Sequence, residues 1–158
     1  MKKTLVIGVG NPILGDDGLG IHAVRQIYEE YKNCKVLENV FFKEISAGGL
    51  GILENILDFE KVIMIDAVIT GKYKVGKVLK MRIEDFSNTL HSTSPHDVNL
   101  ATAFEIGKRS MPERMPKEVV IYGVEVSKDN IQKFSEELSP EIKESIKEIV
   151  ECVKKEIE

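Results

Sequence analysis

Apolar and polar positions along the chain follow two periods, one typical of buried strands and one typical of amphipathic helices. Apolar runs rich in β-branched residues predict strands at residues 4–9, 36–45, 61–69, 75–83 and 118–126. Apolar positions three and four residues apart predict helices at residues 19–31, 50–57 and 97–108, and a last helix that opens at Ser139-Pro140. This alternation of strands and helices indicates an α/β fold.

The lengths of the connections predict the directions of the strands. Strands that are apolar on both faces are typical of a parallel sheet covered by helices on either side. Residue 75 follows residue 69 too closely for a parallel crossover, which needs about a dozen residues or more. We therefore expect residues 1–158 to form a single three-layer domain. Its twisted, mostly parallel sheet has about five strands, with residues 75–83 as an antiparallel edge strand and helices on both faces.

Composition narrows the class of protein. Of 158 residues, 42% are hydrophobic and 30% are charged, as in an ordinary globular protein. The net charge of −4 argues against nucleic acid as a partner, and no apolar run reaches the roughly 20 residues of a membrane-spanning helix. Cys34 and Cys152 match no metal-binding spacing, so we expect a reducing cytoplasm. We also expect a monomer that binds neither nucleic acid nor a membrane.

The first predicted strand leads into a glycine-rich loop, residues 8–20, with the sequence GVGNPILGDDGLG. Glycines let a backbone turn sharply and approach a ligand closely. Asp16 and Asp17 stand where this loop meets the next helix, so each can cap that helix or hold a cation. The simplest division assigns the helix cap to Asp16 and the cation to Asp17.

Asp66 interrupts the most apolar predicted strand, near its end. Ligands of open α/β sheets bind beyond the carboxyl ends of the strands, so Asp66 and the glycine-rich loop are expected at one edge. An ionised carboxylate in apolar surroundings is costly unless it is paired, and a second carboxylate nearby adds to the cost. Amide groups of a neighbouring loop, or a cation shared with Asp17, would each lower that cost.

His96 is the third candidate. The sequence SPHD at residues 94–97 fits the start of a helix, with Ser94 as N-cap. A helix that leads into a parallel strand begins at the carboxyl edge of the sheet, so His96 is expected near Asp17 and Asp66. The alternative is a surface histidine without a ligand. Two carboxylates and an imidazole would make a metal site with open positions, and these ligand types do not select a single metal.

Several familiar catalytic and phosphate-binding motifs are missing. Ile13 stands where the dinucleotide-binding fingerprint needs its third glycine, and Asp16 stands where a P-loop needs lysine. The sequence also lacks a Gly-x-Ser-x-Gly nucleophile elbow and a His-Glu-x-x-His zinc motif. The usual phosphate-binding loops are therefore excluded, and a helix cap or a cation site remains.

Taken together, these segments resemble the hydrogenase maturation protease family. The likeness begins at residues 8–20 and continues, in the same order, through AGGL at 47–50, IDA at 65–67, SPH at 94–96 and GVE at 123–125. It extends over essentially the whole chain. The resemblance implies a peptidase, an endopeptidase that removes the C-terminal extension from the large-subunit precursor of a nickel–iron hydrogenase.

The resemblance also implies which residues form the site. The metal-contacting positions of the family fall on Asp17, Asp66 and His96, which we predict as both metal-binding and catalytic residues. The metal is expected to be nickel carried by the precursor and not a permanently bound ion, so that cleavage depends on nickel loading. Polarisation of the carbonyl by the metal, with an aspartate as general base, is reasonable chemistry.

Two other classes of protein remain open. A phosphoacceptor receiver domain also combines acids after its first strand with an aspartate at the end of its third, here Asp16, Asp17 and Asp66, to bind magnesium. The long glycine-rich loop and the lack of Lys-Pro after the last strand count against a receiver. A structural α/β binding module, with the aspartates only as helix caps, is the other alternative.

Overall fold

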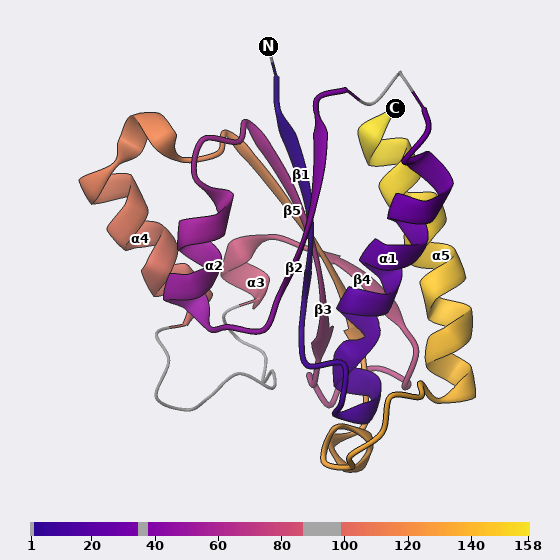
Figure 1. Cartoon of the computed structure of the whole chain (residues 1–158). Coiled ribbons are helices and arrows are strands. Elements are labelled where there is room, and N and C mark those ends of the chain that lie inside the picture. Colours follow the sequence, from indigo (N-terminus) through magenta and orange to yellow (C-terminus); the bar gives the residue numbers. More distant parts are fainter. Residues whose placement is uncertain (1, 35–37, 87–98) are drawn as a thin grey trace.

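The structure is a computed structural model that describes residues 2–34, 38–86 and 99–158. Within these ranges, five strands form one sheet in the order β2-β1-β3-β5-β4 (Figure 1). The strands are β1 (Thr4–Val9), β2 (Val40–Ile45), β3 (Lys61–Val68), β4 (Val78–Met81) and β5 (Glu118–Glu125). β1 pairs in parallel with β2 and β3, β3 pairs in parallel with β5, and β4 is antiparallel to β5. The predicted antiparallel edge strand is therefore confirmed.

Helices cover both faces of the sheet. α1 (Leu19–Tyr31) and α5 (Pro140–Ile157) lie on one face, and α2 (Gly49–Ile56) and α4 (Leu100–Ser110) lie on the other (Figure 1). The shorter elements are α3 (Ile83–Phe86), η1 (Gly15–Gly18), η3 (Pro112–Arg114) and η4 (Lys128–Ile131). None of the helices in the described ranges is long and apolar enough to cross a lipid bilayer. The three-layer α/β fold that the sequence predicts is confirmed.

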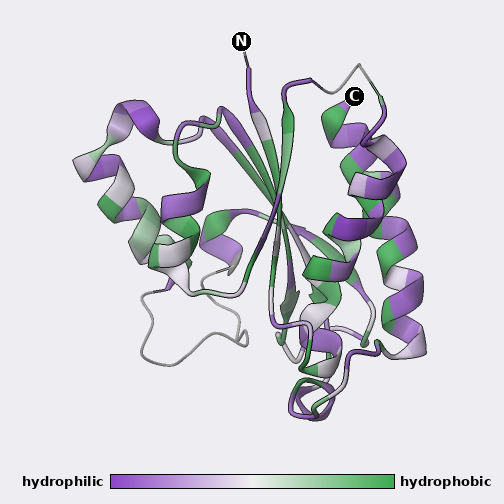
Figure 2. Cartoon of the chain, viewed as in Figure 1, coloured by the Kyte–Doolittle hydropathy of each residue, from purple (hydrophilic) through white to green (hydrophobic). Residues whose placement is uncertain are grey.

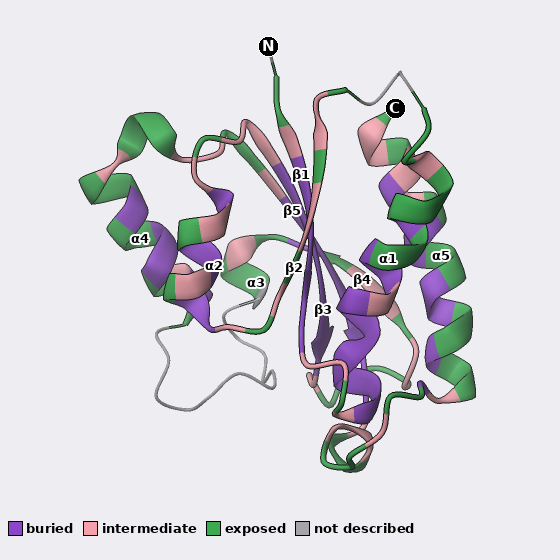
Figure 3. Cartoon of the chain, viewed as in Figure 1, coloured by how far each residue is buried: buried purple, intermediate pink, exposed green. Residues whose placement is uncertain are grey.

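The central strands supply two separate cores because successive side chains of a strand point to opposite faces. Leu5 and Ile7 face α2 and α4, whereas Val6, Ile63 and Ile65 face α1 and α5. All five are fully buried. Figure 3 shows this buried centre between the helices, and Figure 2 shows the apolar stripes of the helices that cover it. The central strands therefore carry apolar residues on both faces, as the sequence pattern indicated.

Several elements differ from the predicted boundaries, and β2, for example, begins at Val40 and not at residue 36. β4 is shorter than residues 75–83, because a turn with Gly76 at a φ of 97° precedes it. α4 begins at Leu100, and Asn99 is its N-cap, with Oδ1 accepting a hydrogen bond from the N–H of Thr102 (2.8 Å). The sequence assigned this cap to Ser94, which is wrong for α4. Residues 94–97, and His96 with them, lie outside the described residues.

Candidate active site

Glycines hold the loop after β1 against the two central strands. A Cβ on Gly8 would lie 2.2 Å from the carbonyl oxygen of Gly20, and one on Gly20 would lie 2.3 Å from that of Ile65. Gly10 has a φ of 145°, and its Cβ would lie 2.0 Å from the carbonyl oxygen of Asp17. Side chains at these positions would push the loop and the start of α1 away from β1 and β3. The glycines thus bring the turn that carries Asp17 close to the sheet.

Asp17 lies in η1 and is only 2% exposed. Its Oδ2 accepts a hydrogen bond from the backbone N–H of Asn11 (2.9 Å). Burial raises the pKa of the Asp17 carboxyl from 3.8 to about 6, and the N–H of Asn11 offsets part of this effect. The carboxylate is therefore held in a fixed position in surroundings that disfavour its charge.

Asp66 lies on β3 and is also only 2% exposed. Its Oδ1 accepts a hydrogen bond from the backbone N–H of Ala67 (2.8 Å). Burial first, and then the negative charge of Asp17, raise the pKa of the Asp66 carboxyl well above 3.8, while the N–H of Ala67 opposes the shift. Because β1 pairs with β3 and Gly20 packs against the carbonyl oxygen of Ile65, Asp17 from the loop after β1 and Asp66 from β3 lie in the same region of the sheet.

Asp16 does not cap α1, which corrects the division of roles made from the sequence. Its Oδ1 accepts a hydrogen bond from the backbone N–H of Ser139 (2.8 Å), and its Oδ2 accepts one from the Ser139 hydroxyl (2.7 Å). Within the described part of the chain, no side chain makes a capping hydrogen bond at the start of η1 or of α1. Ser139 is 123 residues away along the chain. No local sequence pattern reveals a partner at that distance.

Glu125, at the end of β5, is another buried carboxylate. In the sequence it stood out only as the last residue of the GVE segment at 123–125. It is 3% exposed and accepts hydrogen bonds from the N–H groups of Thr70 (2.9 Å) and Gly71 (3.2 Å), as well as from the Thr70 hydroxyl. These bonds fasten the chain that follows β3 to β5. The sequence signal for this role was an acidic residue at the end of an apolar strand. The sequence does not show which groups donate hydrogen bonds to its carboxylate.

The described residues supply two of the three predicted metal contacts. In residues 2–34, 38–86 and 99–158, no group of three or more His, Cys, Asp or Glu residues is arranged to hold a metal ion. His96, the third predicted contact, is outside these ranges. Asp17 and Asp66 fit a cation chemically, because two neighbouring buried carboxylates are costly to ionise together and a positive charge between them offsets that cost.

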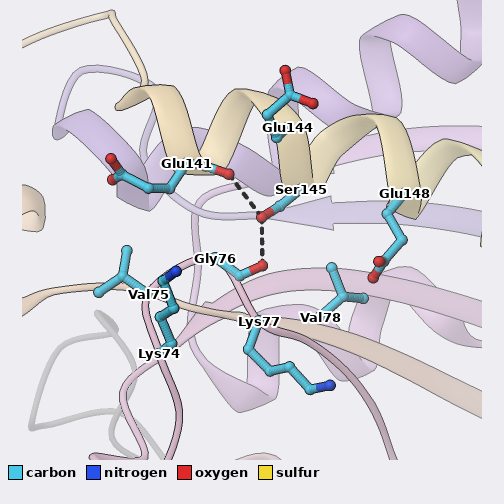
Figure 4. A pocket seen from close by; sticks show the side chains of 9 residues that line it. All are labelled: Lys74, Val75, Gly76, Lys77, Val78, Glu141, Glu144, Ser145 and Glu148. Carbon is cyan, nitrogen blue, oxygen red and sulfur yellow. Dashed lines mark hydrogen bonds between the residues drawn. The ribbon is translucent and has the colours of Figure 1, made fainter.

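A separate groove of about 380 Å³ lies between α5 and the chain that enters β4 (Figure 4). Its lining combines acidic residues of α5 with lysines of the facing segment: Lys74, Val75, Gly76, Lys77, Val78, Glu141, Glu144, Ser145 and Glu148. The hydroxyl of Ser145 lies 2.5 Å from the carbonyl oxygen of Gly76 and 3.0 Å from that of Glu141. Asp17 and Asp66 do not line this groove, so the candidate active site lies elsewhere, at the carboxylate pair.

Comparison with known proteins decides the family. A sequence profile described as hydrogenase maturation protease matches residues 21–156. The chain belongs to the hydrogenase maturation protease family. It is 25% identical over 126 residues to the hydrogenase 2 maturation protease of Escherichia coli (strain K12), which covers 77% of this chain and 72% of that relative. It is 25% identical over 160 residues to a putative hydrogenase maturation protease of Methanocaldococcus jannaschii, covering 99% and 97% of the two chains.

Solved structures agree with the fold of this hydrogenase maturation protease. The hydrogenase maturating endopeptidase HybD from E. coli matches with a TM-score of 0.75 and 21% identity, over 96% of this chain and 89% of that one. The [NiFe] hydrogenase maturation protease HybD from Thermococcus kodakarensis matches with a TM-score of 0.67 and 20% identity, over 99% of both chains. At these identities the likeness shows the fold, and membership of the family makes the chain a peptidase. The family assignment decides against a receiver domain or a purely structural module.

Proposed function

We propose that this hydrogenase maturation protease removes the C-terminal extension of a nickel–iron hydrogenase large-subunit precursor after nickel has been inserted. The observation that carries the proposal is the pair of buried carboxylates, Asp17 and Asp66, which two separate segments of chain hold beside one another. Relatives named as hydrogenase maturation proteases support the class of substrate. The similar Thermococcus protein, a [NiFe] hydrogenase maturation protease, supports the nickel–iron type.

In this proposal, nickel belongs to the substrate. Asp17, Asp66 and His96 contact it when the precursor binds. Imidazole suits nickel, and carboxylate oxygens suit divalent cations in general. The precursor's nickel would offset the repulsion between the two buried carboxylates, and a nickel-free precursor brings no such positive charge. This difference in electrostatic free energy favours binding of the loaded precursor and makes cleavage conditional on nickel.

The hydrolysis needs a group that takes a proton from the attacking water and a group that returns one to the leaving nitrogen. We assign both transfers to the carboxylate pair, because a carboxylate held close to the reacting atoms is a competent general base. The protonated form of the same group can then donate to the amine. The proposal also includes a monomeric enzyme in a reducing cytoplasm, which agrees with the free thiols of Cys34 and Cys152.

The test incubates the protein with nickel-loaded and nickel-free precursor and follows the mass of the precursor. Only the loaded precursor should lose a C-terminal peptide. The variants Asp17→Asn, Asp66→Asn and His96→Ala should remain folded and lose cleavage. Asp58→Asn is the control, because Asp58 is paired with Arg114 on the surface (2.8 Å), and it should cleave normally. Equal cleavage of the two precursors, or full activity in all three site variants, would disprove the proposal.

A further inference from the structure

The turn that carries Asp17 is fixed to the start of α5 by its other aspartate. Asp16 is 1% exposed, and both of its carboxylate oxygens accept hydrogen bonds from Ser139, at 2.8 Å from the backbone N–H and 2.7 Å from the hydroxyl. We call this pair of bonds the Asp16–Ser139 brace. A buried carboxylate with two short hydrogen bonds has one strongly preferred position, so the brace fixes the orientation of η1.

Ser139 forms the brace instead of capping its own helix. An N-cap serine normally accepts a hydrogen bond from an amide of the first helical turn, which stabilises a helix by about 1 kcal/mol. Ser139 is the N-cap residue of α5, but its side chain makes no such capping bond, and its hydroxyl donates to Asp16. The usual role of an N-cap serine thus gives way to a contact with the loop that carries Asp17.

Backbone hydrogen bonds hold the same loop from the same side. The N–H of Gly15 donates to the carbonyl oxygen of Ser135 (2.8 Å), and the N–H of Ser135 donates to that of Ile13 (2.9 Å). These bonds fix the chain before η1, and the brace fixes the turn itself. Asp17 is covalently next to Asp16, so a rotation of η1 that breaks the brace also moves the carboxylate of Asp17 relative to Asp66.

We propose that Asp16 is a positioning residue of the peptidase, which acts through Ser139 to hold the Asp17 carboxylate in its productive place beside Asp66. This inference rests on the proposed role of Asp17 in contacting the precursor's nickel. Displacing a reacting group by about 1 Å can slow catalysis on the order of 100-fold, even when the substituted residue does not touch the substrate. Asp16 therefore affects the reaction without contacting it.

A residue that only stabilises the fold would act differently, and α5 provides the comparison. Ser145 lies six residues after Ser139, within α5, is 5% exposed, and its hydroxyl contacts the carbonyl oxygen of Gly76 (Figure 4). Ser139→Ala and Ser145→Ala each remove one hydroxyl that fastens α5 to another segment. Both variants should lose stability, Ser139→Ala the more because its hydroxyl donates to a carboxylate, but only Ser139 is connected to the turn of Asp17.

The experiment measures kcat and KM for cleavage of nickel-loaded precursor, together with Ni²⁺ binding by calorimetry, at a temperature where every variant is folded. Asp16→Ala should lower kcat by roughly 100-fold and Ser139→Ala by about 10-fold. Ni²⁺ affinity should fall and KM should rise in both variants because Asp17 contacts the precursor's nickel, and the loss of kcat reports the effect on the chemical step. Asp16→Asn, which keeps the shape of the side chain, should recover most of the rate, and Ser145→Ala should match the wild-type protein.

The double variant Asp16→Ala/Ser139→Ala should be no slower than Asp16→Ala alone, because both substitutions break the same contact. Wild-type kcat and Ni²⁺ affinity in Asp16→Ala and Ser139→Ala, with Asp17→Asn inactive, would overturn the positioning role and leave the proposed function intact. Equal losses in Ser139→Ala and Ser145→Ala would also overturn it, because a general loosening of α5 would then explain both. If the wild-type protein fails to cleave loaded precursor, the proposed function fails. In that case Ni²⁺ affinity tests the brace: a fall in Ser139→Ala but not in Ser145→Ala supports it, and any other result overturns it.

Discussion

Gly20 packs directly against the carbonyl oxygen of Ile65, which would lie only 2.3 Å from a Cβ at Gly20. Gly20 follows Asp17 by three residues on the turn into α1, and Ile65 immediately precedes Asp66 on β3. This close contact, together with those of Gly8 and Gly10, therefore lets the two carboxylates approach one another. The glycine-rich sequence is explained by the packing of a helix start against strands and needs no bound phosphate.

Gly20→Ala should destabilise the protein by about 1–3 kcal/mol, the usual cost of overpacking. In an exposed helix a Gly→Ala substitution would stabilise the protein by roughly 1 kcal/mol. The sign of the change in stability therefore shows whether the close contact at Gly20 dominates. Chemical denaturation measures the loss, and cleavage should fall with it because α1 and Asp17 move away from β3.

The control for this substitution is Gly107→Ala in α4. A Cβ there would lie 2.4 Å from the sulfur of Met115 and 2.9 Å from Cδ1 of Leu53, and both are side-chain atoms that can shift, unlike the backbone oxygen of Ile65. Gly107→Ala should therefore be close to neutral. Equal destabilisation by the two substitutions would show that the backbone contact at Ile65 is not the limiting one.

The comparison of sequence and structure shows which relationships local patterns can reveal. The alternation of strands and helices was enough to predict that Asp17 and Asp66 share an edge of the sheet, whereas the structure alone shows that β1 and β3 are neighbours. The partner of Asp16 was not predictable, because Ser139 is 123 residues away and already fitted the role of a helix cap. The start of α4 was mistaken for a similar reason. Ser94 and Asn99 both suit an N-cap, and only the backbone of Asn99 decides between them.

Asp66→Asn should make the metal-free protein more stable at pH 8 while it abolishes cleavage. The substitution removes a buried charge near Asp17 and keeps an oxygen that can accept from the N–H of Ala67. We expect a gain of about 1–3 kcal/mol in the free energy of unfolding, measured by denaturation in the presence of a chelator.

Glu125→Gln is the matched control, because its buried carboxylate accepts several hydrogen bonds from Thr70 and Gly71. There the charge is compensated, so its removal should destabilise by about 1–3 kcal/mol. Destabilisation by both substitutions would mean that the Asp66 charge is also compensated in the metal-free protein.

Glu156 should give the stability of the protein a distinct dependence on pH. Although burial by itself raises the pKa of this carboxyl, hydrogen bonds from Lys61 (2.9 Å) and Lys80 (2.9 Å) outweigh it and lower the pKa from 4.5 to about 2. A lowered folded-state pKa contributes stability above about pH 4.5, and this contribution is lost as the pH falls from there towards 2.

Glu156→Gln should therefore cost about 1–3 kcal/mol at pH 7 and progressively less below pH 4.5. Urea denaturation at pH 7 and pH 3 measures both values, and a difference that does not change with pH would contradict the assignment. Cleavage should be unaffected, since Glu156 lies at the far end of α5 from Ser139.

Asn99→Ala should lower the stability by about 1 kcal/mol, because the first turn of α4 then loses its side-chain cap. Asn99→Asp and Asn99→Ser keep an oxygen in reach of the N–H of Thr102 and should retain most of the stability.

Thr102→Ala is the control, since the backbone donor of the cap survives that change and little stability should be lost. The measurement is thermal unfolding of all four variants. If Asn99→Ala behaved like Thr102→Ala, the cap at Asn99 would contribute nothing, and the case for starting α4 at Leu100 would fail. If only Asn99→Ala is weakened, the cap at Asn99 fixes the start of α4 at Leu100.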